Sequence, residues 1–86
     1  MINPQMHMAY VGMGRSFAAV TRYNDAVEAF KQAAKIMPDS VDAHLELGEI
    51  YLRLSDNEAA MNEYRILKDI NPFMAEQLLE RIKRSR

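Results

Sequence analysis

The fold is decided by the stretch Tyr10-x2-Met13-Gly14-x2-Phe17, which continues with Ala26-x3-Phe30, Ala33 and Pro38. The same arrangement returns further along the chain as His44-x2-Leu47-Gly48-x2-Tyr51, followed by Ala60-x3-Tyr64, Leu67 and Pro72, with every position displaced by the same interval. Internal repeats with periods of roughly 20 to 50 residues are typical of proteins built from short units that stack side by side. We therefore predict a repeat architecture for nearly the whole chain.

The shared offsets of glycine, aromatic residue, alanine and proline resemble those of the tetratricopeptide repeat. The resemblance implies an all-α fold, an α-solenoid of antiparallel helix pairs wound as a right-handed superhelix of about five helices. It divides a single domain into a first repeat (7–40), a second repeat (41–74) and a capping helix (75–86). Residues 1–6 are then a remnant of a preceding repeat or an N-terminal extension. Pro4 precedes Pro38 by the same interval that separates Pro38 from Pro72, which favours the remnant, and a proline that begins a helix is the alternative.

Apolar residues recur with the period of an α-helix in five segments. They predict helices over 7–20, 24–36, 41–53, a fourth ending near 70, and a fifth from 73 onward. The side chains expected to cap these helices are Thr21 or Asn24, then Asp39 or Ser40, then a capping box formed by Ser55-x-x-Glu58. The fifth helix is apolar on one side only, as the outer end of a stacked array requires.

Gly14 and Gly48 are poor helix formers, each costing about 1 kcal/mol relative to alanine. They are understandable only where a neighbouring helix approaches closely, and Ala26 and Ala60 play the same part from the second helix of each pair. The repeated residues are therefore expected to build the packing seam and not a binding site.

Composition excludes several classes of function. The chain has 86 residues, a net charge of −1 and no cysteine, so thiolate metal sites and cysteine nucleophiles are impossible. The near-neutral charge gives no reason to expect a nucleic acid or a membrane as partner. No signal peptide or membrane-spanning segment is predicted, because Arg15 interrupts the apolar run near the N-terminus. We expect a cytoplasmic location, although an anchor on a longer parent chain would not be visible in this sequence.

The sequence also offers no catalytic, cofactor or metal site. Gly12-Met13-Gly14 lies inside a predicted helix and lacks the strand and third glycine of a dinucleotide fingerprint. His44 is expected to be a half-buried packing residue, and His7 to be solvated at a helix start. The basic residues from Arg81 to Arg86 have no aromatic residue among them for base stacking, so they are interpreted as complementing the helix dipole. We expect a non-catalytic protein without a cofactor.

The resemblance also implies where a partner would bind. In tetratricopeptide repeat proteins the first helices of successive repeats line a concave groove that holds a peptide or a partner helix. The corresponding positions in this sequence are Met8, Val11, Arg15, Ala18, Ala19, Asp42, Leu45, Glu49, Leu52, Arg53, Glu76, Leu79 and Lys83.

Four apolar residues of this predicted groove lie off the packing stripe, and apolar side chains on an open face indicate a binding surface. They are Val11, Ala18, Leu45 and Leu52; the alternative is that curvature or a second chain covers them. The Lys–Asn pair of the chaperone-binding carboxylate clamp is absent. We expect a peptide or protein partner with apolar and some basic character, which would face Asp42 and Glu49.

Self-association is the second function that the sequence suggests. Two repeats are fewer than the three or so usually needed for stability. The first helix has no preceding partner, which leaves one flank of Met6, Tyr10 and Met13 open. We therefore predict either a homodimer through the N-terminal helix or an exchange of helices between chains, as in a structural segment of a larger scaffold.

Overall fold

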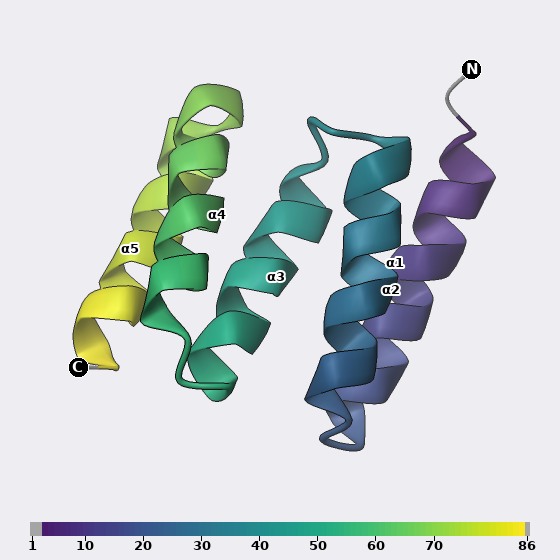
Figure 1. Ribbon diagram of the computed structural model, residues 1–86. Coiled ribbons are helices and arrows are strands. Elements are labelled where there is room, and N and C mark those ends of the chain that lie inside the picture. Colours follow the sequence, from purple (N-terminus) through teal and green to yellow (C-terminus); the bar gives the residue numbers. More distant parts are fainter. Residues whose placement is uncertain (1–2, 86) are drawn as a thin grey trace.

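The computed structural model describes residues 3–85 and consists of five helices joined by short turns (Figure 1). The helices are α1 (Pro4–Ala19), α2 (Tyr23–Ile36), α3 (Val41–Arg53), α4 (Asn57–Ile70) and α5 (Pro72–Arg84). No strand occurs among these described residues. The predicted all-α fold is confirmed.

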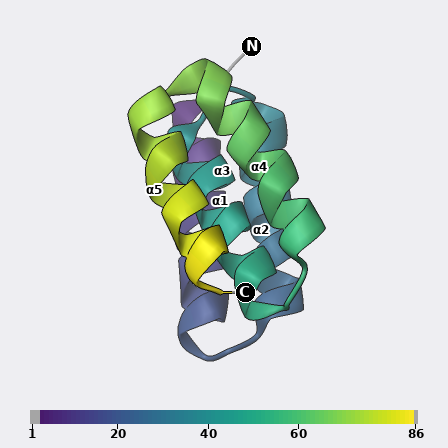
Figure 2. The same cartoon turned by 90° about the vertical axis from the view of Figure 1, so that its left-hand side faces the viewer.

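The helices form two layers. Each helix packs against its neighbours in the chain, and α3 also contacts both α1 and α5. Figure 2 shows α1, α3 and α5 in one layer and α2 and α4 in the other. This is the stacking of antiparallel helix pairs that the period of the sequence predicts.

Two apolar clusters hold the stack together. The first joins α1, α2 and α3, and its largest fully buried side chain is Phe30. The second joins α4 and α5 through Leu67 and Leu78, with half-buried residues of α3 packed against it. Tyr51 packs against both clusters and so connects them. The core is therefore continuous along the stack, and no helix pair is buried by its own contacts alone.

The repeated small residues lie where the sequence predicts close helix contacts. Ala26 and Ala60 are completely buried. A Cβ atom placed on Gly14 would lie 2.6 Å from the ring of Phe30, and one placed on Gly48 would lie 2.5 Å from a methyl group of Leu78. Contacts this short require the neighbour to move, so glycine is needed most strictly at position 14, where the neighbour is a rigid buried ring, and less strictly at position 48, where it is the flexible end of Leu78.

Asparagine and proline begin the first and last helices in the same way. Asn3 and Asn71 occupy the N-cap positions, where their side chains accept hydrogen bonds from backbone N–H groups. Pro4 and Pro72 follow as the first helical residues, where proline loses no hydrogen bond. Residues 4–6 therefore belong to α1, and Pro4 begins that helix as Pro72 begins α5.

Two of the expected caps are wrong. Asp56 caps α4 by accepting from the N–H of Ala59 at 3.1 Å, in place of the Ser55 capping box. Arg22 occupies the N-cap of α2 and makes no side-chain capping bond, so neither Thr21 nor Asn24 caps that helix. Ser40, by contrast, caps α3 as predicted.

The caps expected for α2 and α4 are wrong because of the backbone conformation of the two turns that precede these helices. Thr21 and Ser55, which occupy corresponding positions of the two repeats, both have a φ of 61°, the left-handed conformation that reverses the chain between paired helices. A residue in that conformation cannot serve as an N-cap, which has extended backbone. The cap therefore moves one residue onward.

Replacing Thr21 with glycine is expected to stabilise the fold. Left-handed backbone costs roughly 1–2 kcal/mol for a residue with a Cβ, and threonine is β-branched. Glycine removes this strain, while its greater freedom in the unfolded chain takes back roughly 0.4–1 kcal/mol. We expect a net gain of up to about 1 kcal/mol, or roughly 4–8 °C in the melting midpoint. Thermal unfolding followed by circular dichroism checks this, and a lower midpoint would contradict it.

Candidate functional site

A hollow of about 300 Å³ opens between α1 and α3, beside the turn that leads into α2. Its floor is made of small and apolar side chains and its rim of charged ones. The lining residues are Ala18, Ala19, Thr21, Tyr23, Glu46, Glu49, Ile50 and Arg53. The hollow exists because α1 presents only two alanines here, so the side chains of α3 meet nothing of comparable size across the gap.

Two ion pairs connect the helices of this layer. The Nε–H of Arg15 on α1 donates to Oε2 of Glu46 on α3 at 2.6 Å. An oxygen of Glu49 on α3 lies 3.2 Å from a guanidinium nitrogen of Arg81 on α5. Both pairs are partly exposed, and such pairs contribute at most about 1 kcal/mol each. Their main consequence is positional, because they tie both ends of the layer to α3.

Two of these four charged groups have shifted pKa values. The hydrogen bond to Glu46 raises the pKa of Arg15, against the opposing effect of burial. Burial raises the pKa of Glu49, and the nearby Arg81 partly offsets this. Glu49 is therefore a poorly solvated carboxylate that depends on its cationic neighbour for compensation.

The structure brings four of the predicted groove residues together around the hollow: Ala18, Ala19, Glu49 and Arg53. Arg15 is tied to the same site through Glu46. Five others lie exposed or half-buried elsewhere along the helices of this layer: Met8, Asp42, Glu76, Leu79 and Lys83. Among residues 3–85, Asp42 and Arg53 form no ion pair.

Four of the predicted groove residues have a packing role, contrary to expectation. Ala18 is half-buried and packs against the first cluster. Val11 is completely buried in the first cluster. Leu45 and Leu52 are half-buried and pack against the second cluster. The reason is that α1 and α3 are each covered from two directions, so their buried stripes are wider than the repeated residues indicate. Val11 is not accessible to a partner in this structure.

Several lining residues were not predicted. Glu46 lies one helical turn before Glu49, and its partner Arg15 was the available signal, since opposite charges on adjacent parallel helices can pair. Tyr23 and Thr21 come to the hollow through the turn between α1 and α2. No periodicity in the sequence places a turn residue beside α3, so reasoning from helical faces misses them.

Both histidines are more buried than the sequence suggests. His7 is 6% exposed and its Nε2 lies 2.7 Å from Oγ of Ser40, so the expectation of a solvated residue is wrong. The cause is the earlier start of α1, which puts His7 in its second turn beneath the start of α3. His44 is 7% exposed, with Nδ1 2.7 Å from Oε1 of Glu63 and Nε2 2.8 Å from the carbonyl oxygen of Pro38.

Residues 3–85 meet neither the requirements of a metal site nor those of a membrane-spanning helix. No three histidine, aspartate or glutamate side chains there gather closely enough to hold a metal ion. Within the same range, no helix combines the length and the apolar character needed to cross a membrane.

Comparison with known proteins agrees with the architecture. No match is found among the curated proteins. A family model described as tetratricopeptide repeat matches residues 11–75, which span both helix pairs and reach into α5. Repeats of this kind are generally protein–protein interaction modules and are typically non-catalytic. The match covers well over half of the chain, and the fold agrees with it, so the chain belongs to the tetratricopeptide repeat family.

Proposed function

We propose that the layer of α1, α3 and α5 binds a segment of a partner protein, with one partner side chain held in the hollow between α1 and α3. The observation that carries this proposal is the hollow itself, which combines small apolar residues with a charged rim. Sites of this kind take an anchoring side chain and orient it through a few polar groups. The general role of the family in protein interactions supports the same conclusion.

The charges suggest the chemistry of the partner segment. Glu46 and Glu49 are already compensated by Arg15 and Arg81, whereas Arg53 at the rim and Asp42 at the start of α3 have no intramolecular partner among the described residues. These two lie on one face of α3, about 16 Å apart at the helical rise. An extended segment of roughly five residues spans that distance. We propose an apolar anchor flanked by an acidic residue near Arg53 and a basic residue near Asp42.

Substituting Arg53→Glu should weaken this binding roughly tenfold, because it replaces attraction by repulsion at the rim. The probe is a set of peptides selected from a random display library on the wild-type protein, with affinities measured by fluorescence anisotropy. Arg65→Glu is the matched control, since Arg65 is also exposed but lies on α4 in the other layer. Ala19→Glu, which adds a side chain to the hollow, should weaken binding as well.

The choice of these variants follows from the structure. Leu45 and Leu52 help to hold α5, so glutamates there would destabilise the fold as well as change the surface. Arg53 and Ala19 are exposed, so their substitution leaves the core intact, and circular dichroism of each variant checks that it is folded. Selected peptides that bind wild type, Arg53→Glu and Ala19→Glu with equal affinity would contradict the proposal.

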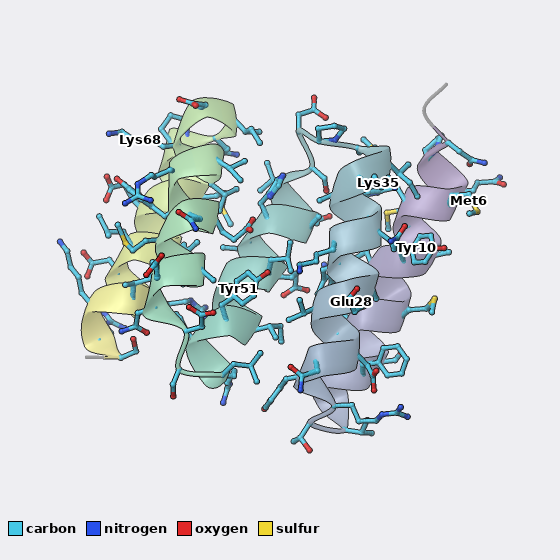
Figure 3. The ribbon with its side chains drawn as sticks, viewed as in Figure 1. Met6, Tyr10, Glu28, Lys35, Tyr51 and Lys68 are labelled. Carbon is cyan, nitrogen blue, oxygen red and sulfur yellow. The ribbon has the colours of Figure 1, made fainter. Side chains whose placement is uncertain are left out.

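The predicted self-association concerns a different surface. The open flank of α1 points away from α3, and the hollow is on the α3 side (Figure 3). A scaffold segment could therefore associate through α1 and still bind a partner segment on the layer of α1, α3 and α5.

A further inference from the structure

At the end of the stack formed by α1 and α2, no further helix pair of residues 3–85 covers the surface, which carries two ordered stripes. The stripe on α1 is apolar: Met6, Tyr10, Met13 and Phe17, spaced i, i+4, i+7 and i+11. The stripe on α2 is polar: Asp25, Glu28, Gln32 and Lys35, spaced i, i+3, i+7 and i+10. Together we name these eight residues the end face. A shallow pocket of about 200 Å³ lies between the stripes, lined by Tyr10, Met13 and Phe17 of α1 and by Asp25, Glu28, Ala29 and Gln32 of α2.

The repeat itself shows that the apolar stripe is suited to burial. Met13 corresponds in position to Leu47 of the second repeat. Leu47 is 2% exposed because α2 covers it, whereas Met13 is 47% exposed. Met6, in the same stripe, is 45% exposed. Figure 3 shows Met6 and Tyr10 on the side of α1 that points away from the rest of the stack. The same type of surface is therefore buried in the second repeat and open in the first.

The opposite end of the stack is not complementary to this surface. The outer side of α5 is polar, with Glu76, Gln77, Glu80 and Arg84 all exposed. An apolar stripe placed on that side would bury charges without partners, which is costly. Head-to-tail stacking of chains is therefore disfavoured, and the end face is left to pair with a surface like itself.

The polar stripe is charged in opposite senses at its two ends. Asp25 and Glu28 lie in the first half of α2, and Lys35 lies in its last turn, so a reversed copy of the stripe is complementary to it. Asp25 also pairs with the guanidinium of Arg22 at 2.8 Å, and this pair is partly exposed, so that Asp25 can accept a second cation. Figure 3 shows Glu28 and Lys35 in opposite halves of the helix. Pairing with a reversed copy puts Asp25 of each chain opposite Lys35 of the other, and Glu28 opposite Gln32.

The two stripes have a common centre, which a symmetric pairing requires. Phe17 and Asp25 are equally far along the chain from the turn at Thr21, and Met6 and Lys35 are almost equally far from it. In two antiparallel helices, residues that are equally far from the connecting turn lie at the same level along the helix axes. Phe17 and Asp25 do line the same pocket. One twofold axis through the middle of the face therefore relates both stripes to their reversed copies.

We propose that the end face binds the end face of a second copy of this chain, with α1 antiparallel to α1 and α2 antiparallel to α2 about that twofold axis. Such an isologous contact buries both apolar stripes and closes the assembly at two chains. The proposal is independent of partner binding in the hollow, which stays open in the dimer.

A pair of charge reversals tests the geometry. Asp25→Lys alone puts lysine opposite Lys35, and Lys35→Glu alone puts glutamate opposite Asp25, so each variant should dimerise roughly tenfold more weakly than wild type. Mixed in equal amounts, the two variants regain both attractive pairs and should form a heterodimer of wild-type strength. Analytical ultracentrifugation over a range of concentrations measures all four cases, and circular dichroism of each variant alone confirms that it is folded.

A second set of variants tests whether the apolar stripe of the end face forms the contact between the two chains. Met13→Lys places a charge in the middle of the apolar stripe and should reduce dimerisation by tenfold or more, since the contact buries both copies of Met13, each opposite Tyr10 of the other chain. Phe73→Lys is the matched control, because Phe73 is 71% exposed but lies on α5. Three results would overturn the proposal: a wild-type monomer at all concentrations, equal effects of Met13→Lys and Phe73→Lys, or a mixture of charge variants that associates no better than either alone.

Discussion

Gly14→Leu is expected to lower the free energy of unfolding by about 3 kcal/mol, at the upper end of the usual cost of overpacking. A Cβ atom at this position would lie 2.6–2.7 Å from three atoms of the Phe30 ring. The ring is rigid and 1% exposed, so it has no free space into which to turn. Leucine adds three further carbons to the same contact. For a chain of this size, such a loss is a large part of a stability that begins near about 5 kcal/mol.

Gly12→Leu is the matched control two residues away. A Cβ atom on Gly12 would meet no atom within 4 Å, and the residue is exposed. The substitution should stabilise α1 by up to about 1 kcal/mol, because glycine is a poor helix former. Urea unfolding followed by circular dichroism measures both variants. Equal effects of the two substitutions would show that close packing against Phe30 is not what requires glycine at position 14.

Gly48→Leu should have a smaller effect than Gly14→Leu. The atoms closest to a Cβ at Gly48 are the terminal methyl groups of Leu78, at 2.5 and 2.8 Å. A leucine can change its rotamer, and α5 is held on one side only, so part of the strain can relax. The difference in unfolding free energy lost by the two glycine-to-leucine substitutions therefore depends on the stiffness of the opposing side chain.

The sequence predicts those parts of the fold that depend on spacing. Glycine and alanine at fixed offsets mark where helices touch, and the structure confirms this at Gly14, Gly48, Ala26 and Ala60. The sequence does not predict the backbone of the turns, because a residue in the left-handed conformation, such as Thr21 or Ser55, has no distinctive side chain. The caps expected for α2 and α4 were therefore placed one or more residues away from the true ones.

The structure brings one part of the predicted groove together around the hollow and buries another part. The buried residues of α1 are His7, Val11 and Gly14, a stripe displaced from the repeated Tyr10, Met13 and Phe17. The repeated residues face the preceding unit of an array, and in the first repeat that side is open. A pattern read from one helix cannot show which neighbour is present, so Val11 was assigned to the open face although α3 covers it.

Glu63→Ala is expected to cost about 3 kcal/mol, the lower end of the usual loss when one partner of a buried ion pair is removed. The side chains of His44 and Glu63 are only 9% and 12% exposed. Removing the carboxylate leaves Nδ1 of His44 buried without an acceptor, and it releases the contact that fixes α4 on α3. Glu58→Ala, at an exposed glutamate in the first turn of the same helix, is the control and should cost well under about 1 kcal/mol.

The geometry around His44 also predicts how stability depends on pH. Both ring nitrogens face oxygen acceptors, the Glu63 carboxylate and the Pro38 carbonyl, and only the doubly protonated ring can donate to both. The hydrogen bond to Glu63, followed by that to Pro38, raises the pKa of His44 above its ordinary 6.5, although burial opposes this. Because folding favours the protonated ring, this contribution is complete below pH 6.5 and is lost as the pH rises through the higher pKa of the folded state.

Glu63→Gln separates the charge from the packing in this pair. Glutamine keeps an oxygen acceptor for Nδ1 but removes the carboxylate that favours the imidazolium, so its cost should be greater at pH 6 than at pH 8. Glu49 contributes a dependence of the same sign, since burial raises its pKa above 4.5 and folding then favours its neutral form. The contribution of Glu49 is complete below pH 4.5 and is lost as the pH rises through its raised pKa, so urea unfolding of wild type and Glu49→Gln is compared from about pH 4 upward, and that of wild type and Glu63→Gln at pH 6 and pH 8. If Glu63→Gln destabilised the protein equally at pH 6 and pH 8, the protonated His44 would not be the species that joins Pro38 to α4.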